Sequence, residues 1–290
     1  MPDPIILYGM GATKAGTSWL YRHLHDHPEV AMRAVKEAHY WDTFAPQRRV
    51  DQLHAFGNRL KEMRQGLVKA KAAGEQWRVR NHERRIDDME RLIAVLEEDR
   101  TDDSRYLAWL IKGTGEAKVV GEITPGYAGI GPDRLARMRD LLPTTRFIYL
   151  LRDPVDRLWS HVSMHANRTK QTPDAVLRSV LDGGERHIAR MGDYITVIER
   201  LQSVIPEDRL LIGFCEEMFA GPGLERINTF LGISQRPGPD EAVNESAAQE
   251  MDETLRPRVA DYLRDQYHWT AQHMGPLPQR WQDNLRRAST

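Results

Sequence analysis

The stretch Gly11-Ala12-Thr13-Lys14-Ala15-Gly16-Thr17-Ser18 lies between two segments of different periodicity. A short apolar run from Pro4 to Tyr8 precedes it, and helix-like spacing of Trp19, Leu20 and Leu24 follows it. This order predicts a strand, a glycine-rich loop and a helix. Such a loop presents backbone N–H groups and the positive end of the helix to a phosphate group. The stretch therefore indicates a phosphate-binding loop in an α/β fold.

The position of the lysine distinguishes this loop from the ATP-binding form, which reads G-x-x-x-x-G-K-[ST]. The spacing from Gly11 to Gly16 fits that form, but Thr17 occupies the lysine position and Lys14 lies inside the loop. A lysine after the last glycine reaches the β- and γ-phosphates of a triphosphate, whereas one inside the loop lies closer to a shorter 5′ chain. An acidic strand end that would hold Mg²⁺ is not obvious, although Glu122 is a candidate. A kinase that uses ATP and Mg²⁺ therefore remains an alternative.

Apolar runs and helical patterns alternate along the rest of the chain. Continuous apolar runs are typical of parallel strands that are buried on both faces, and the alternation predicts helices between them. We therefore expect an α/β fold in which helices flank a central, mainly parallel sheet. The tail from His268 shows little periodicity. Expected strands are Val30–Met32, Lys118–Glu122, Phe147–Leu151 and Leu210–Phe214, and expected helices are Pro132–Leu142, one starting at Asp153-Pro154, Ile188–Val204 and Leu224–Leu231.

Residues 51–110 interrupt this alternation. The segment up to about Arg100 is rich in charge and almost free of proline, and its apolar residues recur at steps of three or four. That spacing predicts two amphipathic helices in a hairpin with its turn near Gly74. We interpret 51–110 as a helical insertion in a single domain of residues 1–290. A solvated surface insertion, a lid over an acceptor and a homodimer contact are the alternatives for its role.

Composition narrows the classes of partner. Lysines and arginines number 41 and carboxylates 42, so no global field favours nucleic acid or an anionic membrane. No apolar run approaches the roughly 20 residues that a membrane span needs. Cys215 is the single cysteine, which rules out an internal disulfide and mildly favours a reducing compartment. We expect a cytoplasmic protein without a nucleic-acid partner or a membrane span.

A second candidate anion site follows the predicted strand Phe147–Leu151. Arg152 comes at the strand end, and Ser160 comes eight residues later on the next helix. Arginine offers a planar fork for phosphate, and serine adds a short hydroxyl. Together with Lys14–Ser18, this arrangement resembles the PAPS-dependent sulfotransferases, in which PAPS (3′-phosphoadenosine 5′-phosphosulfate) donates a sulfuryl group. Only a 3′-phosphorylated nucleotide needs an anion pocket away from its 5′ chain, which favours PAPS over ATP.

Further segments are similar to the bacterial and carbohydrate-type branch of that family. The match covers residues 4–44 and 118–233 and, loosely, 244–267, and it omits the insertion. Two features depart from relatives: Ile123 stands where many glycan-modifying relatives have lysine, and the late loop that covers the nucleotide in the cytosolic branch is absent. Arg236, Arg280 and Arg286 are the alternatives for that covering role. The matching segments are Lys36–Asp42, Gly121–Tyr127, Gly213–Met218 and Leu224–Ile233.

The resemblance implies a role for each matching residue. Glu37 would be the general base, with His39 as the second candidate, and Lys14 would stabilise the leaving phosphate. The acceptor would be a hydroxyl or amine of a carbohydrate, lipid or secondary metabolite, and the family needs no metal. The residues expected to bind PAPS are Lys14, Ala15, Gly16, Thr17, Ser18 and Trp19 in and after the loop, and Arg152 and Ser160 at the 3′-phosphate.

Three other groups of residues have competing interpretations. On a helix His23, His25 and His27 cannot all converge on a metal, and Glu122 is better suited to fixing the loop beside Tyr127 than to taking a proton. Packing and stacking on a ligand are equal alternatives for three tryptophans. A non-catalytic nucleotide-binding or helical interaction module is the remaining alternative for the whole chain. The three tryptophans are Trp41, Trp159 and Trp281.

Overall fold

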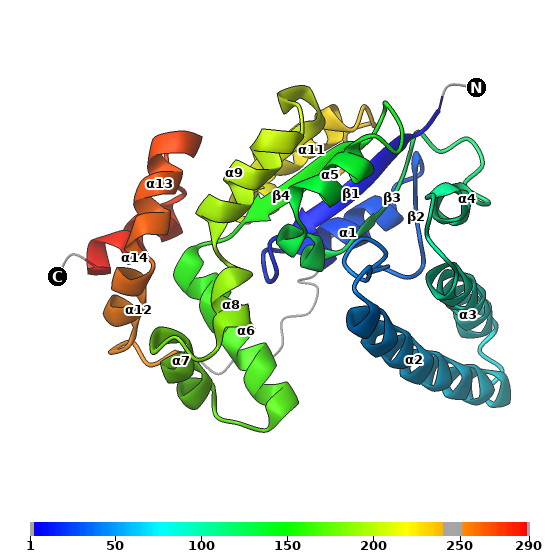
Figure 1. The fold of residues 1–290 in the computed structure, drawn as a ribbon, viewed down its shortest axis with the longest axis horizontal. Coiled ribbons are helices and arrows are strands. Elements are labelled where there is room, and N and C mark those ends of the chain that lie inside the picture. Colours follow the sequence, from blue (N-terminus) through cyan, green and yellow to red (C-terminus); the bar gives the residue numbers. More distant parts are fainter. Residues whose placement is uncertain (1–2, 240–250, 289–290) are drawn as a thin grey trace.

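The fold is built around a parallel β-sheet (Figure 1). The computed structural model describes residues 3–239 and 251–288, so residues 244–250 of the loosely matching stretch lie outside it. Within the described residues the sheet has five strands, all parallel, in the order β2-β3-β1-β4-β5. The α/β class and the parallel sheet expected from the sequence are confirmed. The strands are β1 (Ile5–Gly11), β2 (Val30–Met32), β3 (Val119–Ile123), β4 (Arg146–Leu151) and β5 (Leu210–Phe214).

Strand β1 occupies the centre because both of its faces are apolar. Ile6 and Leu7 are fully buried, as expected for a strand covered on both sides. A β-carbon at Gly121 in β3 would lie only 2.2 Å from the Leu7 carbonyl oxygen, so glycine permits the close pairing of β1 and β3. The chain continues from β1 toward β2 on one side and reaches β4 on the other. The C-terminal end of β1 is therefore the topological switch point, where α/β sheets bind ligands.

Helices cover both faces of the sheet. The connection from β1 to β2 contains α1, and the connection from β3 to β4 contains α5. These two connections run in opposite directions across the sheet, so right-handed crossovers place α1 and α5 on opposite faces. Helix α1 lies beside α11, where His23 Nε2 is 3.1 Å from Asn228 Oδ1, and α5 contacts α9 (Figure 1). The helices are α1 (Thr17–His25), α2 (Pro46–Ala72), α3 (Gln76–Glu97), α4 (Ser104–Ile111), η1 (Pro125–Gly129, a 3₁₀ helix), α5 (Pro132–Arg139), α6 (Pro154–Thr169), α7 (Pro173–Leu181), α8 (Arg186–Arg190), α9 (Tyr194–Val204), η2 (Glu207–Arg209, a 3₁₀ helix), α10 (Cys215–Ala220), α11 (Pro222–Phe230), α12 (Arg256–Tyr262), α13 (Arg264–Met274) and α14 (Gln279–Ala288).

The region 51–110 is helical, as expected. Helices α2 and α3 pack against each other, and Gly74 adopts φ of 69° in the turn between them. Figure 1 shows this pair extending away from the sheet on the side of β2. Helix α4 leads back to β3 and buries Tyr106 and Leu110 in the core. The pair is thus anchored to the sheet through α4. The N-terminal end of α2 lies near the C-terminal ends of the strands, where the glycine-rich loop follows β1.

The structure differs from the expected helix pattern in several places. The helix expected over Ile188–Val204 is split into α8 and α9, because Asp193 caps a new helix by accepting the Thr196 N–H at 3.1 Å. Gly192 lies in the break, where a β-carbon would collide with the buried guanidinium of Arg157. Helix α7 and the three C-terminal helices were not expected. No helix in residues 3–239 and 251–288 combines the length and apolarity that crossing a membrane requires.

The C-terminal helices are held by contacts that are distant in sequence. Asp156 in α6 pairs with Arg256 at 2.8 Å and with Arg280 at 2.7 Å. Trp281 is fully buried and donates from Nε1 to Glu216 at 3.1 Å. Because these stabilising partners lie in α6 and α10, the local pattern of the tail carries little information about its helices.

A buried carboxylate, Glu122, lies at the end of β3 beneath the switch point. Its oxygens accept hydrogen bonds from the Tyr106 and Tyr127 hydroxyls at 2.5 and 2.8 Å. They also accept from the Thr124 hydroxyl at 2.6 Å and from the Ala38 backbone N–H at 3.0 Å. Burial raises the pKa of Glu122, while these four donors act in the opposite direction. Glu122 thus connects β3 to α4, η1 and the segment that carries residues 36–38.

Replacing Glu122 with alanine tests this network. Glu122→Ala should lower the free energy of unfolding by about 3 kcal/mol, because four buried donors lose their acceptor in a site closed to water. Chemical denaturation measures the change. The exposed Glu116 provides the control, since Glu116→Ala should change stability by less than about 0.5 kcal/mol. A loss below about 1 kcal/mol for Glu122→Ala would show that the network contributes little.

Candidate active site

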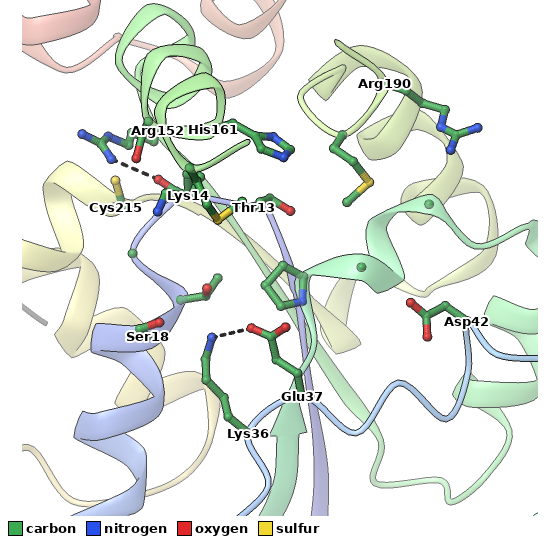
Figure 2. Close-up of a pocket in the computed structure, with 18 of the residues that line it drawn as sticks. Thr13, Lys14, Ser18, Lys36, Glu37, Asp42, Arg152, His161, Arg190 and Cys215 are labelled. Carbon is green, nitrogen blue, oxygen red and sulfur yellow. Dashed lines mark hydrogen bonds and ion pairs between the residues drawn. The ribbon is translucent and has the colours of Figure 1, made fainter. Parts of the chain in front are cut away.

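A cleft of about 1250 Å³ opens at the C-terminal ends of the central strands. The loop after β1, the segment 36–42 after β2, η1 after β3 and Arg152 after β4 all line it. Helices α6 and α8 and the N-terminal end of α2 complete the wall. In Figure 2, Arg152 and Cys215 lie at one side of the cleft, Arg190 and Asp42 at the other, and Lys14 and Glu37 between them. Residues from most of the chain therefore meet at the switch point.

The loop after β1 has a defined backbone shape. The Ala12 N–H donates to the Leu150 carbonyl at 2.7 Å, and the Ala15 N–H donates to the Ala12 carbonyl at 3.1 Å. Gly16, at φ of 76°, is the N-cap of α1. Lys14 adopts φ of 73°, in the left-handed region that non-glycine residues rarely occupy. The first N–H groups of α1 have no acceptor within the helix, so this loop and helix end form an anion-binding cradle.

Two cations meet at this cradle. The Arg152 guanidinium donates from Nη1 to the Lys14 carbonyl oxygen at 3.2 Å. Burial lowers the pKa of Lys14, and the charges of Arg152, Arg168 and Lys36 lower it further. Among residues 3–239 and 251–288, no carboxylate lies within ion-pair distance of Lys14 or Arg152. An anion bound here would relieve the repulsion between these cations.

The residues expected to bind the nucleotide lie together at the cleft, and all of them except Ala15 line it. Ala15 is fully buried beneath the loop and does not line the cleft, so it can contribute only through its backbone. Trp19 lines the edge of the cleft and packs edge-on against Phe219 at 5.3 Å between ring centroids. The residues of this set that line the cleft are Lys14, Gly16, Thr17, Ser18, Trp19, Arg152 and Ser160.

The opposite wall carries a row of alternating charges. Lys36 Nζ lies 3.0 Å from Glu37 Oε1, and His39 Nε2 lies 3.5 Å from Glu37 Oε2. His39 Nδ1 lies 3.0 Å from Asp42 Oδ2. His39 has φ of 54°, so it is a second cleft residue in the left-handed region. Asp42 is buried, and Arg48 approaches it to 3.4 Å. The imidazole of His39 is therefore held between two carboxylates.

Neighbouring charges determine the protonation states in this row. Burial alone would raise the pKa of Glu37, but the hydrogen bond from His39 and the charge of Lys36 outweigh it and lower this pKa to about 2. Burial would lower the pKa of His39, but hydrogen bonds to Asp42 and Glu37 raise it to about 9. At neutral pH the row therefore contains an ionised Glu37 and an imidazolium at His39.

Sequence patterns did not single out several cleft residues. Asp42 was part of a matching segment but had no assigned role, although its place three residues after His39 suits a partner. His161 follows Ser160 on α6 and is buried, and burial together with the Arg157 charge lowers its pKa to about 3. The side chains of Arg168 and Arg190 also line the cleft. Nothing in the local sequence indicates that these last three face a ligand.

The other candidate residues have structural partners. Trp41 donates to the Tyr8 hydroxyl at 3.2 Å, and Trp41, Trp159 and Trp281 are all buried in the core. Arg280 reaches the cleft while pairing with Asp156. Arg236 lines a separate cavity beside α1, and Arg286 pairs with Asp283 on α14.

The three histidines of α1 and its end face different partners. His23 contacts Asn228, His25 contacts Asp26, and His27 contacts the Ser234 carbonyl oxygen. In the described part of the chain, no group of three histidine, cysteine or carboxylate side chains is arranged to hold a metal ion.

Comparisons with known proteins agree with this architecture. The profile of the sulfotransferase family matches residues 4–235. The structure is similar to that of a sulfotransferase from Alicyclobacillus acidocaldarius, with 20% identity, a TM-score of 0.64 and coverage of 97% of this chain and 100% of that one. It also matches the sulfotransferase domain of the Synechococcus PCC 7002 olefin synthase, with 17% identity, a TM-score of 0.49 and coverage of 81% and 75%. No protein of curated function matches the chain.

The family match covers most of the chain, and the chain therefore belongs to the sulfotransferase family. Its parallel sheet and flanking helices are the fold of the Alicyclobacillus enzyme. The resemblance drawn from the loop and from the Arg152 segment is thus confirmed at the level of the family.

The protonation of His39 can be measured directly. In a proton NMR titration its Cε1–H resonance should move with a midpoint near pH 9. Because this pKa is raised above the ordinary value of 6.5, its contribution to stability is complete below pH 6.5 and is lost as the pH rises through about 9.

Asp42→Asn should shift that midpoint toward 6.5, since it removes the charge that stabilises the imidazolium. The exposed Asp283→Asn serves as the control and should leave the midpoint unchanged. A wild-type midpoint at or below 6.5 would contradict the assigned charge state.

Proposed function

We propose that this protein transfers the sulfuryl group of PAPS to a hydroxyl or amine of a carbohydrate, lipid or secondary-metabolite acceptor. The observation that carries the proposal is the position of two cations, Lys14 and Arg152, at the loop after β1, with Glu37 across the same cleft. Neither cation has a carboxylate partner among the described residues. Membership of the sulfotransferase family supports the reaction class. A kinase is less well supported, because the loop lacks lysine at position 17.

The residues of the cradle suit a nucleotide with two separate anionic groups. Lys14 and the backbone N–H groups of Thr17 and Ser18 would hold the 5′-phosphosulfate. Lys14 would also stabilise the negative charge on the leaving phosphate. Arg152 and Ser160 line the same side of the cleft and would hold the 3′-phosphate. PAPS supplies the sulfuryl group and departs as 3′-phosphoadenosine 5′-phosphate (PAP). In the transfer, the bond between sulfur and the phosphate oxygen breaks as the acceptor oxygen or nitrogen bonds to sulfur.

Glu37 would take the proton that the acceptor loses. Its side chain is 38% exposed and lines the cleft, so an acceptor can reach it. His39, the second candidate base, has both ring nitrogens facing carboxylates, and we assign it the role of holding Glu37 in place. Sulfuryl transfer then needs in-line placement and general-base assistance, without a metal.

Lys36 can link donor binding to the strength of this base. A carboxylate with a pKa of about 2 is a weak base, and Lys36 is one of the groups that keep the pKa of Glu37 low. Lys36 also lies within electrostatic range of Lys14. The negative oxygens of a bound sulfuryl group would attract the Lys36 ammonium away from Glu37. The pKa of Glu37 would then rise toward its ordinary value of 4.5.

Other features expected from the sequence remain part of the proposal. The chain would act as one domain of residues 1–290 in the cytoplasm, without a nucleic-acid partner. The insertion at 51–110 would help to form the acceptor end, since Arg48, just before it on α2, lines the cleft. The alternative role as a homodimer contact is supported by the exposed Trp77 and Val68 on α3 and α2.

Nucleotide preference tests the proposal. PAP without Mg²⁺ should raise the melting temperature in a thermal-shift measurement, because it fills both anion positions. ATP with Mg²⁺ should give a smaller shift. The reverse order would favour the kinase, and the absence of any nucleotide response would favour a non-catalytic helical module.

Two substitutions distinguish the proposed general base from a residue that binds the nucleotide. Glu37→Gln should lower kcat by about 10²- to 10⁴-fold while PAP affinity stays unchanged, because only proton transfer is lost. Arg152→Ala should weaken PAP affinity by roughly 10- to 100-fold through the loss of charged hydrogen bonds.

Steady-state kinetics and PAP titrations measure these two effects. Glu217→Gln, on α10 and outside the cleft lining, is the matched control and should behave as the unaltered protein. A near-normal rate for Glu37→Gln would remove Glu37 as the base and return His39 to that role.

A further inference from the structure

The cleft lining as a whole has an excess of positive charge. Among the described residues that line the cleft, eight are lysine or arginine and four are carboxylates, although the whole chain has a net charge of −1. The excess is therefore local to the cleft. Lys14 and Arg152 match the anionic groups of the proposed donor, so the question concerns the arginines on the opposite side.

Each carboxylate in the cleft already has partners. Glu37 contacts Lys36 and His39, and Asp42 contacts His39 and Arg48. On the donor side, Asp156 pairs with arginines, and Glu216 accepts the Asp153 N–H at 2.8 Å and the Trp281 Nε1–H at 3.1 Å. No free carboxylate remains in the described lining to neutralise the arginines at the far end.

The side chains of Arg190 and Arg168 are two of the cleft arginines that have no counter-ion among the described residues. Both are exposed and line the cleft, and within residues 3–239 and 251–288 neither has a hydrogen-bond or ion-pair partner. Arg48 adds a third guanidinium, which is 57% exposed and touches Asp42 only at 3.4 Å. Figure 2 places Arg190 on the side of the cleft opposite Arg152, with the Glu37 carboxylate below both of them in this view. A hydroxyl held at Glu37 would leave the rest of its molecule facing these arginines.

The arginines act on the same place in the cleft. His187 on α8 lies within the electrostatic range of both Arg190 and Arg48, and after burial their charges are the largest causes that lower its pKa. His187 is therefore neutral at neutral pH and adds no charge of its own, while its ring packs edge-on to His161 at 6.2 Å. Helices α8 and α2 thus place two guanidinium groups within electrostatic range of the same side chain, and a guanidinium group is suited to binding a planar or tetrahedral anion.

We propose that the acceptor carries an anionic group, a carboxylate or a phosphate or sulfate ester, that binds Arg190 and Arg48 while its hydroxyl faces Glu37. The inference rests on the proposed sulfuryl transfer, because that reaction places the acceptor hydroxyl at Glu37. It restricts the acceptor to acidic sugars, acidic phenols or phosphorylated molecules. A neutral acceptor would leave the Arg190 guanidinium without a counter-ion, and Arg48 with only its contact to Asp42.

Matched pairs of probes test the charge preference with the donor site filled. Protein saturated with PAP is titrated by calorimetry with 4-nitrophenyl glucuronide against 4-nitrophenyl glucoside, 4-hydroxybenzoate against its methyl ester, and glucose 6-phosphate against glucose. The acid should bind at least about tenfold more tightly than the neutral member in one pair or more. That advantage should shrink between about 50 mM and 500 mM salt. The pair that responds tells which anion the site takes.

Arg190→Ala should abolish the advantage of the acid. Arg186→Ala is the matched control, since Arg186 lies on the same helix but does not line the cleft, and it should retain the advantage. An advantage that survives Arg190→Ala, or the absence of any acid preference in all three pairs, would overturn the inference. Binding of PAP in the same samples reports on the proposed function separately, because PAP contacts the opposite side of the cleft.

Discussion

The buried carboxylate of Glu122 is the constraint on which the Glu37 side of the cleft depends. A charged or polar group without access to water must have its hydrogen bonds made within the protein. The four donors to Glu122 come from three parts of the chain: α4, the segment after β2, and the stretch that leads from β3 into η1. Satisfying one side chain therefore fixes the relative positions of elements that share no local sequence. The position of the Ala38 backbone follows from it, and Glu37 is the next residue.

From Glu37 onward, the side chains of this wall are held in place by ion pairs. Glu37 is held by Lys36 and His39, His39 by Asp42, and Asp42 by Arg48 at the start of the insertion. At the loop after β1 the equivalent link is a hydrogen bond from the Arg152 side chain to the Lys14 carbonyl oxygen. The cleft thus joins two halves of different construction. One half is a cradle made of backbone, and the other is a chain of alternating side-chain charges.

The elements of the fold that depend on local sequence patterns could be predicted. The buried strands, the loop after β1 and the helices of the insertion depend on apolar periodicity and on glycine, so the sequence indicates them directly. The C-terminal helices are held by tertiary partners of Asp156 and by the burial of Trp281, and the sequence analysis did not identify them. The same holds within the site. The identity of Glu37 and His39 followed from a family resemblance, but the charge of His39 depends on Asp42, and Arg190 enters the cleft only because α8 ends beside it.

The left-handed backbone at Lys14 and His39 has a consequence for how the protein would lose activity on heating. Each such residue costs roughly 1–2 kcal/mol that the surrounding fold must supply. Both residues lie in loops, on opposite sides of one cleft. Loops that store strain open at a lower free energy than the sheet beneath them. Warming would therefore disorganise the catalytic surface while the core remained folded, and the temperature at which turnover fails would lie below the temperature at which the chain melts.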